Sequence, residues 1–326
     1  MITFEEPNLA PSEHPDLDNL QYPIYCSVKF DGVRAVIIDG EAYSRKGLLL
    51  HTVFHERFKS FLDKTIGTPG VFDCEVFSPD ATFQQITSSL ANRDGVPLKL
   101  YVFDYLATDE WYGTSKTEFA YRQNHVHQIL QRLDPYQEYA VPVEQKLCYD
   151  KDEIQAELGS VLANGGEGLM LRHPRQLYKH GRSTAKATPE KGGGFFKYKP
   201  FDTLDAVIIG FQQKKRLTGE AKECITDIDA FGRSKRGHRK GDREFVDEIG
   251  AVICEIPNRT YINDKGKEQK YIFNATWSKG GTVRTDITWQ NKEQYIGRWV
   301  EVEYQSCGVK YLPRLPRIKR FRPDLD

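Results

Sequence analysis

The string Lys29-Phe30-Asp31-Gly32-Val33-Arg34 is the part of this chain that most directly indicates its fold and chemistry. Apolar and β-branched residues lie on both sides of it, so we expect a strand, a tight turn permitted by Gly32, and a returning strand. Lys29 would then lie at the edge of a cleft, with Arg34 close to it. A lysine attacks an activated phosphate only after it has lost a proton, and a partly buried strand end beside another cation favours that state. Taken alone, this string could also be an ordinary surface turn between two strands, without a reactive lysine.

The residues around this string predict an α+β domain with antiparallel sheets. Apolar and β-branched runs bounded by turn residues predict strands, and apolar residues that recur at helical spacing predict helices. The pair Gly165-Gly166 would end the last of these helices. The expected strands cover about 24–29, 33–39, 70–77 and 99–105, and the expected helices cover about 53–64, 118–133 and 152–164.

The pattern changes near residues 201–206, where a series of short strands with glycine turns begins. Such a series with a basic exterior predicts a small Greek-key barrel of the oligonucleotide/oligosaccharide-binding (OB) fold. Between its first two strands lies a polar segment, from about 212 to 246, and a structureless stretch of that length is usually functional or disordered. We therefore expect one domain over 1–203 and a barrel domain over 204–326. The expected barrel strands are 204–211, 249–256, 269–276 and 298–305.

Length and composition limit the possible classes of protein. A chain of 326 residues is long enough for two domains of about 150 residues with separate cores. No apolar run reaches the roughly 18 residues of a membrane helix, and no signal peptide is evident, so we expect no membrane association and a cytosolic protein, in the host cytosol if the chain is viral. The six cysteines form no C-x-x-C pair, which argues against structural zinc and a disulfide framework.

The formal net charge is zero, but the charges are distributed unevenly. Residues 1–20 carry acids without lysine or arginine, and we expect no separate DNA-binding domain before Lys29. Residues 309–322 carry lysines and arginines without an acid, and a second basic cluster lies in the polar segment. Positive charge concentrated in this way is typical of a protein that binds the phosphate backbone of a nucleic acid. The predicted DNA contacts in the second cluster are Arg233, Lys235, Arg236, Arg239, Lys240 and Arg243.

Further side chains suited to nucleotide transfer follow Lys29 along the chain. The guanidinium group of arginine can bind two phosphate oxygens at once, and carboxylates bind magnesium. Lysines neutralise charge on a transferred phosphoryl group. Each of these residues also has an ordinary structural interpretation. A glutamate at the start of a strand is usually a solvated edge residue, a phenylalanine in a strand is usually part of the core, and two lysines two residues apart usually lie on an exposed strand face. Their presence together in one domain favours a nucleotide-transfer site. The candidates are Arg34, Arg45, Glu75, Phe103, Glu167, Lys197 and Lys199.

This ordered series resembles the nucleotidyltransferase motifs of the superfamily that contains ATP-dependent DNA ligases, RNA ligases and mRNA capping enzymes. The resemblance covers nearly the whole chain and implies a nucleotidyltransferase (adenylation) domain followed by an OB-fold domain. The string from Arg314 to Asp324 looks like the terminal motif of DNA ligases, and Leu177-Tyr178-Lys179-His180-Gly181 is similar to small bacteriophage DNA ligases. These two strings favour a DNA ligase over its relatives.

The resemblance implies a reaction that begins at Lys29. This lysine would take AMP from ATP with Mg²⁺ or Mn²⁺ present, and AMP would pass to the 5′-phosphate of a nick before the 3′-hydroxyl displaces it. Arg34 and Arg45 would bind the AMP phosphate or the 5′-phosphate. Glu75 would hold the ribose or the metal.

The remaining roles are implied in the same way. Phe103 would stack on adenine, and Glu167 would bind the catalytic metal. Lys197 and Lys199 would contact the α-phosphate, and Arg322 would help to position the pyrophosphate that leaves in the first step.

Three positions depart from the family pattern. DNA ligases often carry a glutamate two residues before the nucleophile to recognise the adenine amino group, and this chain has Ser27 there. A lysine commonly follows the aspartate of the terminal motif, where this chain has Leu325, so Arg322 and Lys319 would have to act in its place. Cys74 stands where the family usually has glycine.

The sequence therefore predicts a monomeric ATP-dependent DNA ligase, reduced to its catalytic core, that acts on nicked double-stranded DNA. An RNA ligase or a GTP-dependent capping-type enzyme is the alternative enzyme, and a nucleic-acid-binding OB protein is the alternative without activity. The two domains would move about a hinge near Pro200-Phe201-Asp202. The segment 212–246 resembles in position the latch of a small algal-virus ligase and is expected to contact DNA.

Overall fold

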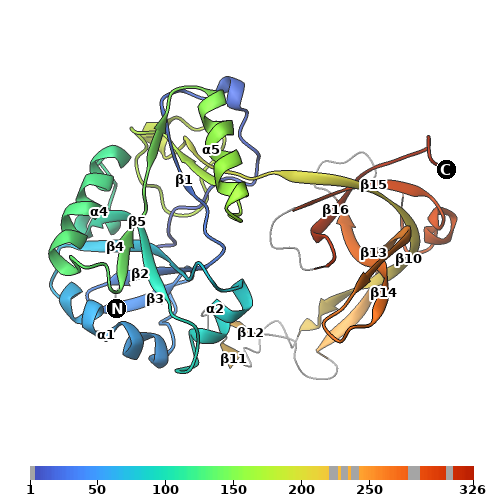
Figure 1. The fold of residues 1–326 in the computed structure, drawn as a ribbon, viewed down its shortest axis with the longest axis horizontal. Helices are drawn as coiled ribbons and strands as arrows, with labels where there is room; N and C mark the ends of the chain where they lie inside the picture. The colour runs from blue at the N-terminus through green and yellow to red at the C-terminus, as the bar shows by residue number, and fades with distance from the viewer. Residues whose placement is uncertain (1–3, 220–226, 229–233, 236–241, 278–286, 306–310) are drawn as a thin grey trace. The chain divides into compact units, whose positions relative to one another are not determined.

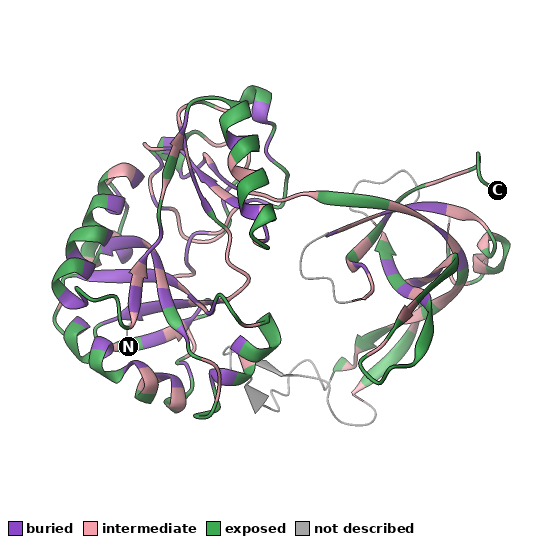
Figure 2. Ribbon diagram, viewed as in Figure 1, coloured by how far each residue is buried: buried purple, intermediate pink, exposed green. Residues whose placement is uncertain are grey.

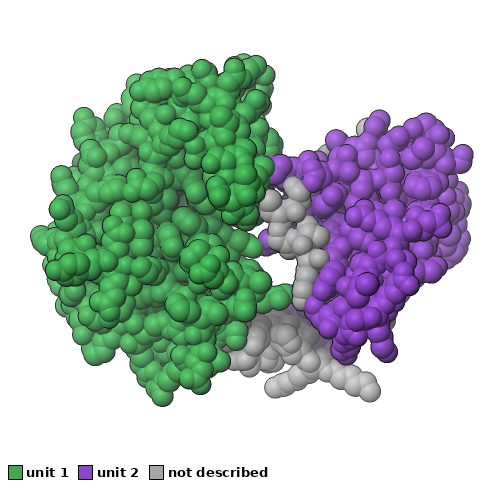
Figure 3. Space-filling model, in the orientation of Figure 1, with its two compact units in different colours: residues 1–198, 228–234 green, residues 199–227, 235–326 purple. Residues whose placement is uncertain are grey.

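The computed structural model of this chain has two compact units (Figure 3). Unit 1 comprises residues 1–198 and 228–234, and unit 2 comprises residues 199–227 and 235–326. The chain passes from the first to the second between Tyr198 and Lys199, shortly before the boundary expected from the sequence. The structure describes residues 4–219, 227–228, 234–235, 242–277, 287–305 and 311–326.

Unit 1 is built on two sheets (Figure 1). Their strands all pair antiparallel except β5 with β6, so the predicted α+β fold with antiparallel sheets is confirmed. The five-stranded sheet has the order β3 (Glu41–Ser44), β2 (Val33–Ile38), β4 (Gly70–Phe77), β5 (Lys99–Ala107), β6 (Ala140–Pro142). The four-stranded sheet has the order β7 (Lys146–Cys148), β1 (Ile24–Val28), β8 (Leu169–Arg172), β9 (Phe195–Tyr198).

Helices cover one face of each sheet. In α1 (Thr52–Thr65), Phe54, Phe58 and Phe61 recur at intervals of three and four residues, so they share one buried face. That face and the apolar stripe of α4 (Phe119–Leu133) pack in one core with β2, β4 and β5. α5 (Lys151–Ala163) packs in the same way against β1 and β8. Figure 2 shows these helices buried on one side and exposed on the other.

The shorter elements of unit 1 lie between these strands and helices. They are η1 (Leu17–Asn19), α2 (Phe83–Ser89), α3 (Thr108–Trp111) and η2 (Pro189–Lys191). Across the described parts of the chain, no helix is both long and apolar enough to pass through a membrane. The cysteines that the structure describes are free thiols in the interior, namely Cys26, Cys74, Cys148 and Cys254.

Unit 2 is a closed five-stranded barrel, as predicted. The order around it is β10 (Phe201–Leu217), β13 (Arg243–Ile262), β14 (Glu268–Trp277), β16 (Arg314–Phe321), β15 (Trp299–Gln305). Among the described strand pairs of this barrel, β14 with β16 is parallel and the others are antiparallel. Apolar residues from all five strands fill the interior, among them Ile208, Cys254, Phe273, Val302 and Ile318. A short turn of 3₁₀-helix, η3 (Lys292–Tyr295), precedes β15.

The expectation of a structureless segment from 212 to 246 is wrong at both of its ends. β10 continues to Leu217 and β13 already begins at Arg243, and the two strands pair as a ribbon with Lys215 opposite Phe245. A polar two-stranded ribbon buries no core face, so it lacks the hydrophobic alternation from which strands are predicted. Between residues 219 and 242, only the strands β11 (Asp227–Ile228) and β12 (Ser234–Lys235) are described, and they pair with each other.

The predicted DNA contacts of this segment fall mostly outside the described residues. Arg233, Arg236, Arg239 and Lys240 are not described, and of Lys235 only the backbone is. Arg243 is exposed at the start of β13. The DNA-binding role of the cluster therefore stays a prediction.

Candidate active site

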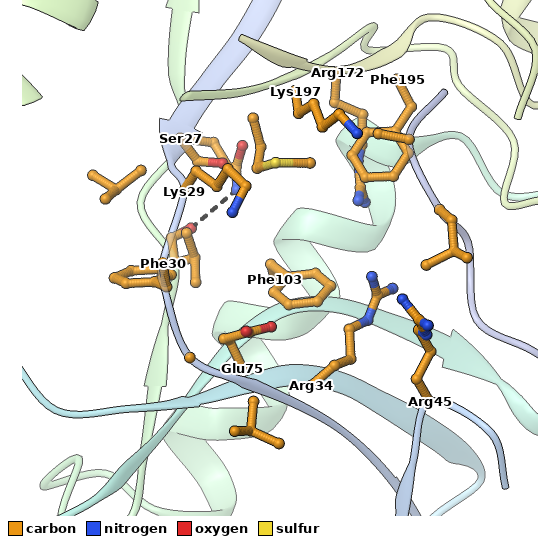
Figure 4. Close-up of a pocket in the computed structure, with 18 of the residues that line it drawn as sticks. Ser27, Lys29, Phe30, Arg34, Arg45, Glu75, Phe103, Arg172, Phe195 and Lys197 are labelled. Atoms are coloured by element: carbon orange, nitrogen blue, oxygen red, sulfur yellow. Dashed lines mark hydrogen bonds between the residues drawn. The ribbon is translucent and has the colours of Figure 1, made fainter. Parts of the chain in front are cut away.

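A cavity of about 360 Å³ lies in unit 1 and is lined from both sheets (Figure 4). The five-stranded sheet contributes Arg34 from β2, Glu75 from β4 and Phe103 from β5. The other sheet contributes Ser27, at the end of β1, and the residue that follows that strand, Lys29. It also contributes Met170 and Arg172 from β8, and Phe195 and Lys197 from β9. The cavity therefore brings together residues that are far apart in the sequence.

Lys29 is held at the rim of this cavity by its backbone and its side chain. Its amide donates to the carbonyl of Gly168, with 2.8 Å between nitrogen and oxygen. Its ammonium forms a short ion pair with the carboxylate of Glu167. The side chain of Glu167 is 7% exposed, whereas that of Lys29 is 22% exposed. The amine is thus accessible from the cavity, and the acid behind it is buried.

Gly32 is needed for space and not for an unusual backbone angle. A Cβ atom at this position would lie 2.4 Å from the carbonyl oxygen of Val76, which is closer than real Cβ atoms approach backbone. Any side chain would push the turn away from β4. The absence of a side chain therefore keeps the Lys29 turn against the sheet that carries Arg34 and Glu75.

Arg34 is fixed by a buried acid that was not among the predicted site residues. Its Nε donates to Oδ1 of Asp73 at 2.6 Å and its Nη2 forms a shorter bond to Oδ2, while the hydroxyl of Tyr178 donates to the same Oδ2 at 2.6 Å. Burial alone would lower the pKa of Arg34, but the charge and hydrogen bonds of Asp73 raise it above its usual value. Arg34 therefore stays cationic, and it lines the cavity as a charged group in a fixed position.

Phe103 reaches the cavity because β5 contains a bulge. Asp73 pairs with Asp104 and Cys74 pairs with Val102, so Phe103 is an extra residue without a partner on β4. A bulge turns a side chain away from its regular direction, and bulges are frequent beside active sites. The carbonyl of Phe103 accepts a hydrogen bond from Gln123 Nε2 at 2.6 Å, and the Arg34 guanidinium lies 4.8 Å from the centre of its ring. Gln123 on α4 therefore fixes the backbone of the bulge, and Arg34 on β2 packs against the ring.

Arg172 is a cavity residue that the sequence prediction missed. Its Nη1 donates to Oδ2 of Asp104 at 2.6 Å, and its guanidinium lies 4.1 Å from the ring centre of Phe195 and 4.4 Å from that of Phe119. Burial lowers the pKa of Arg172 to about 10, so it remains charged at neutral pH. Its position at the end of an apolar strand was visible in the sequence, but its direction depends on the buried partner Asp104.

Glu75 faces the cavity below Phe103 (Figure 4). Burial raises the pKa of this carboxyl to about 7, although the charges of Arg34 and Lys29 oppose the shift. No group of three or more histidine, cysteine or acidic side chains suited to a metal ion occurs among the residues that the structure describes. Mg²⁺ does not require such a group, because it commonly binds one or two carboxylates together with phosphate oxygens and water. Glu75 and Glu167 are therefore chemically suited to such an ion in the presence of a nucleotide.

Further cations lie around the cavity, and an acid from the start of the chain lies beside two of them. Lys46 and Arg45 follow β3, and the Glu6 carboxylate lies 2.7 Å from Lys46 Nζ and 4.0 Å from Arg45 Nε. Arg182 also lines the cavity, and its Nη1 donates to the carbonyl of Ala10 at 2.7 Å. Lys46 and Arg182 were not predicted, because nothing in their local sequence separates them from surface cations.

Three of the predicted nucleotide-site residues are not among those that line this cavity, and one of them is Glu167, which contacts Lys29. Lys199 follows the end of β9 and belongs to unit 2, whereas Lys197, two residues earlier, is in the lining. Arg322 also belongs to unit 2, where it binds Asp205 and Asp324 at 2.7 and 2.8 Å. The roles of Glu167, Lys199 and Arg322 stay predictions.

Comparison with known proteins identifies a family for the larger part of the chain. Residues 8–188 match the family model described as "ATP dependent DNA ligase domain". DNA ligase 2 of Haloquadratum walsbyi is 28% identical over 200 residues, which are 56% of this chain and 30% of that protein. A DNA ligase of Halorubrum lacusprofundi is 27% identical over 287 residues, which are 81% of this chain and 41% of that protein. The chain thus spans less than half of the length of these relatives.

Solved structures agree in fold. The structure Pmar-Lig_Pre has a TM-score of 0.67 and 20% identity, covering 98% of this chain and 67% of that one. A structure from an analysis of Lig E DNA ligases has a TM-score of 0.61 and 18% identity, covering 97% of this chain and 99% of that one. At these identities the likeness concerns the fold alone.

Proposed function

Because the chain belongs to the ATP-dependent DNA ligase family, we propose that it seals 5′-phosphate/3′-hydroxyl nicks in duplex DNA through a lysine–AMP intermediate. The observation that carries this proposal is the position of Lys29. Its amine reaches the same cavity as an aromatic ring, a carboxyl and several cations, which are the groups that a nucleotide requires.

In the first step, Nζ of Lys29 would attack the α-phosphorus of ATP after losing a proton. A bond between phosphorus and nitrogen forms, the bond from the α-phosphorus to the β-phosphate oxygen breaks, and pyrophosphate leaves. Glu167 would position the lysine, because its buried carboxylate contacts Nζ directly. Division of one difficult condensation into covalent steps lowers the barrier of each.

The cations of the cavity would bind the phosphates. Arg34 is oriented in advance by Asp73, and this fixed geometry reduces the entropy lost when the phosphate binds. Lys197 and Arg172 line the cavity beside Phe195 and would stabilise the negative charge that develops on the transferred group. Arg45 is more exposed and is suited to the AMP phosphate or the 5′-phosphate of the nick. We also assign Lys199 to the α-phosphate, on the basis of the family resemblance.

Phe103 and Glu75 would hold the nucleoside. The ring of Phe103 offers a flat face to the base, and Met170 lines the same cavity with a polarisable thioether. Glu75 can accept hydrogen bonds from the ribose hydroxyls. Glu75 and Glu167 would also hold Mg²⁺ or Mn²⁺, which when bound would neutralise negative charge on the phosphates.

The second and third steps take place on DNA. AMP would pass from Lys29 to the 5′-phosphate of the nick, and the 3′-hydroxyl would then attack that phosphate and release AMP. We propose that the basic segment between β10 and β13 contacts the duplex, that Arg322 acts only in the first step, and that the protein works as a monomer in the cytosol.

One experiment tests this function and its rivals together. The protein is incubated with α-labelled ATP or GTP and Mg²⁺, and then with nicked duplexes in which each strand is DNA or RNA. The proposal predicts a labelled protein with ATP and a sealed DNA strand. Label from GTP, or sealing of RNA alone, would favour a capping-type enzyme or an RNA ligase. Absence of any adduct would favour a nucleic-acid-binding protein without activity.

A further inference from the structure

The cavity contains few neutral polar side chains, although it is rich in charged ones. Among the described residues that line it, the uncharged polar side chains are Ser27, Ser44 and Gln145. Ser44 is already engaged in the turn after β3, because its hydroxyl accepts from the amides of Lys46 and Leu48, each at 3.3 Å. A serine hydroxyl and a glutamine amide carry both donors and acceptors, so either can match the hydrogen-bonding edge of a base. Ser27 and Gln145 are therefore the side chains available to such an edge.

Ser27 and Gln145 are placed side by side by the strand register. In the antiparallel pair of β1 and β7, Tyr25 pairs with Leu147 and Cys26 with Lys146. One further step along the same register brings Gln145 opposite Ser27, and directly opposed residues project from the same face of a sheet. Both line the cavity. Figure 4 shows Ser27 on the Lys29 side of Phe103, whereas Arg34 and Arg45 lie on the other side.

The loop that carries Gln145 is anchored to both sheets. It connects β6 with β7, and the amide of Val143 donates to the carbonyl of Val102 on β5 at 2.9 Å. Val102 is the residue before Phe103, so the same stretch of β5 supports the loop and the aromatic ring. A base that lies on Phe103 would therefore present its edge to this loop.

The orientation of the Gln145 amide determines which base it accepts. Its Nε2 donates to the carbonyl of Val143 at 3.4 Å, which leaves Oε1, an acceptor, for a ligand. Adenine carries an amino donor at position 6, and guanine carries a carbonyl acceptor there. Two acceptors that face each other are repulsive and leave both without a hydrogen bond. A serine hydroxyl can donate or accept, so Ser27 suits either base.

We propose that Gln145 is the residue that selects adenine over guanine in this protein, with Ser27 as an adaptable second contact. The inference rests on the proposed function and adds to it the residue that sets base specificity. It accounts for recognition of ATP without an acidic side chain at position 27.

The test compares ATP with GTP in a set of matched variants. Gln145→Met keeps the length of the side chain but removes the amide, and it should lower the ratio of kcat/KM for ATP over GTP in Lys29 labelling by about tenfold. Gln145→Glu keeps an acceptor and should retain the preference for ATP. Ser27→Ala should weaken both nucleotides and leave the ratio unchanged. Glu144→Gln, at the exposed neighbouring position, serves as the control.

A second readout separates this inference from the proposed function. Equilibrium binding of ATP and GTP is measured without metal, so that the result does not depend on adduct formation. If the parent binds ATP more tightly and Gln145→Met loses that preference, the inference holds even where no adduct forms. If the ratio of the two affinities is the same in the parent, Gln145→Met and Gln145→Ala, the inference is overturned, whatever the activity.

Discussion

Arg34 binds Asp73 through two nitrogen atoms, and the Asp73 side chain is completely buried beneath the cavity. The hydroxyl of Tyr178, from a loop far along the chain, donates to the same carboxylate. Arg34 is therefore placed by groups that themselves do not line the cavity. Such prior orientation is useful for a phosphate ligand, because the guanidinium does not have to be ordered when the ligand binds.

We expect Asp73→Asn to impair both stability and catalysis. Loss of one partner of a buried ion pair leaves the other without compensation and should cost about 3 kcal/mol of unfolding free energy. The rate of Lys29 labelling should fall by about a hundredfold, because Arg34 is no longer held. Tyr178→Phe removes a single hydrogen bond and should cost only about 1 kcal/mol. Denaturant unfolding and labelling kinetics check both; equal effects of the two variants would argue against this role of Asp73.

Glu75 should make the stability of the nucleotide-free protein depend on pH. Its pKa is raised from the ordinary 4.5 to about 7, so the folded state binds this proton more tightly than the unfolded state. Its contribution is fully present below about pH 4.5 and is lost as the pH rises towards about 7. The free energy of unfolding should therefore fall across this window, and fall less in Glu75→Gln. If Glu75→Gln and the exposed control Glu144→Gln follow the same curve as the parent, the raised pKa is contradicted.

Arg322 should matter for the first chemical step and not for the last. It is held within the barrel by Asp205 and Asp324, and the family resemblance assigns it to pyrophosphate, which is present only in the first step. We expect Arg322→Ala to slow labelling of Lys29 by ATP strongly while sealing of a DNA nick that already carries AMP is nearly unchanged. A similar loss in both assays would show that Arg322 acts elsewhere.

We expect that the segment between the two ends of the ribbon can be removed without disturbing the barrel. The amide of Thr218 donates to the carbonyl of Asp242 at 3.0 Å, so a short glycine-serine linker can replace residues 219–241. Labelling of Lys29 should persist, whereas binding to nicked DNA should weaken and lose part of its salt dependence, because fewer phosphate contacts release fewer counterions. An unchanged affinity with an unchanged salt slope would mean that the segment does not contact DNA.

Elements with strong periodicity could be predicted from the sequence. α1, α4 and α5 lie within one or two residues of their expected limits, because each carries an apolar stripe at helical spacing. The strand before Lys29 and the strand after Gly32 were predicted for the same kind of reason. The basic strand β16 was predicted only as a motif, since Lys319 and Arg320 mask the alternation, and they pair with Glu301 on the neighbouring strand.

The site residues that were missed depend on contacts between distant segments. Phe103 was named, but the bulge that turns it into the cavity results from the pairing of β5 with β4. Arg172 becomes a cavity residue because Asp104 holds it, and Gln145 does so because of the register of β7 against β1. No pattern within a short stretch of sequence contains this information.

Intact-protein mass spectrometry after incubation with ATP and Mg²⁺ can show whether Lys29 is the nucleophile. We predict that the parent gains the mass of one AMP and that peptide mapping places it on Lys29. Lys29→Ala and Lys29→Arg should gain nothing, since arginine stays protonated and cannot attack. A parent that gains no AMP, or a Lys29→Ala variant that still does, would contradict this role of Lys29.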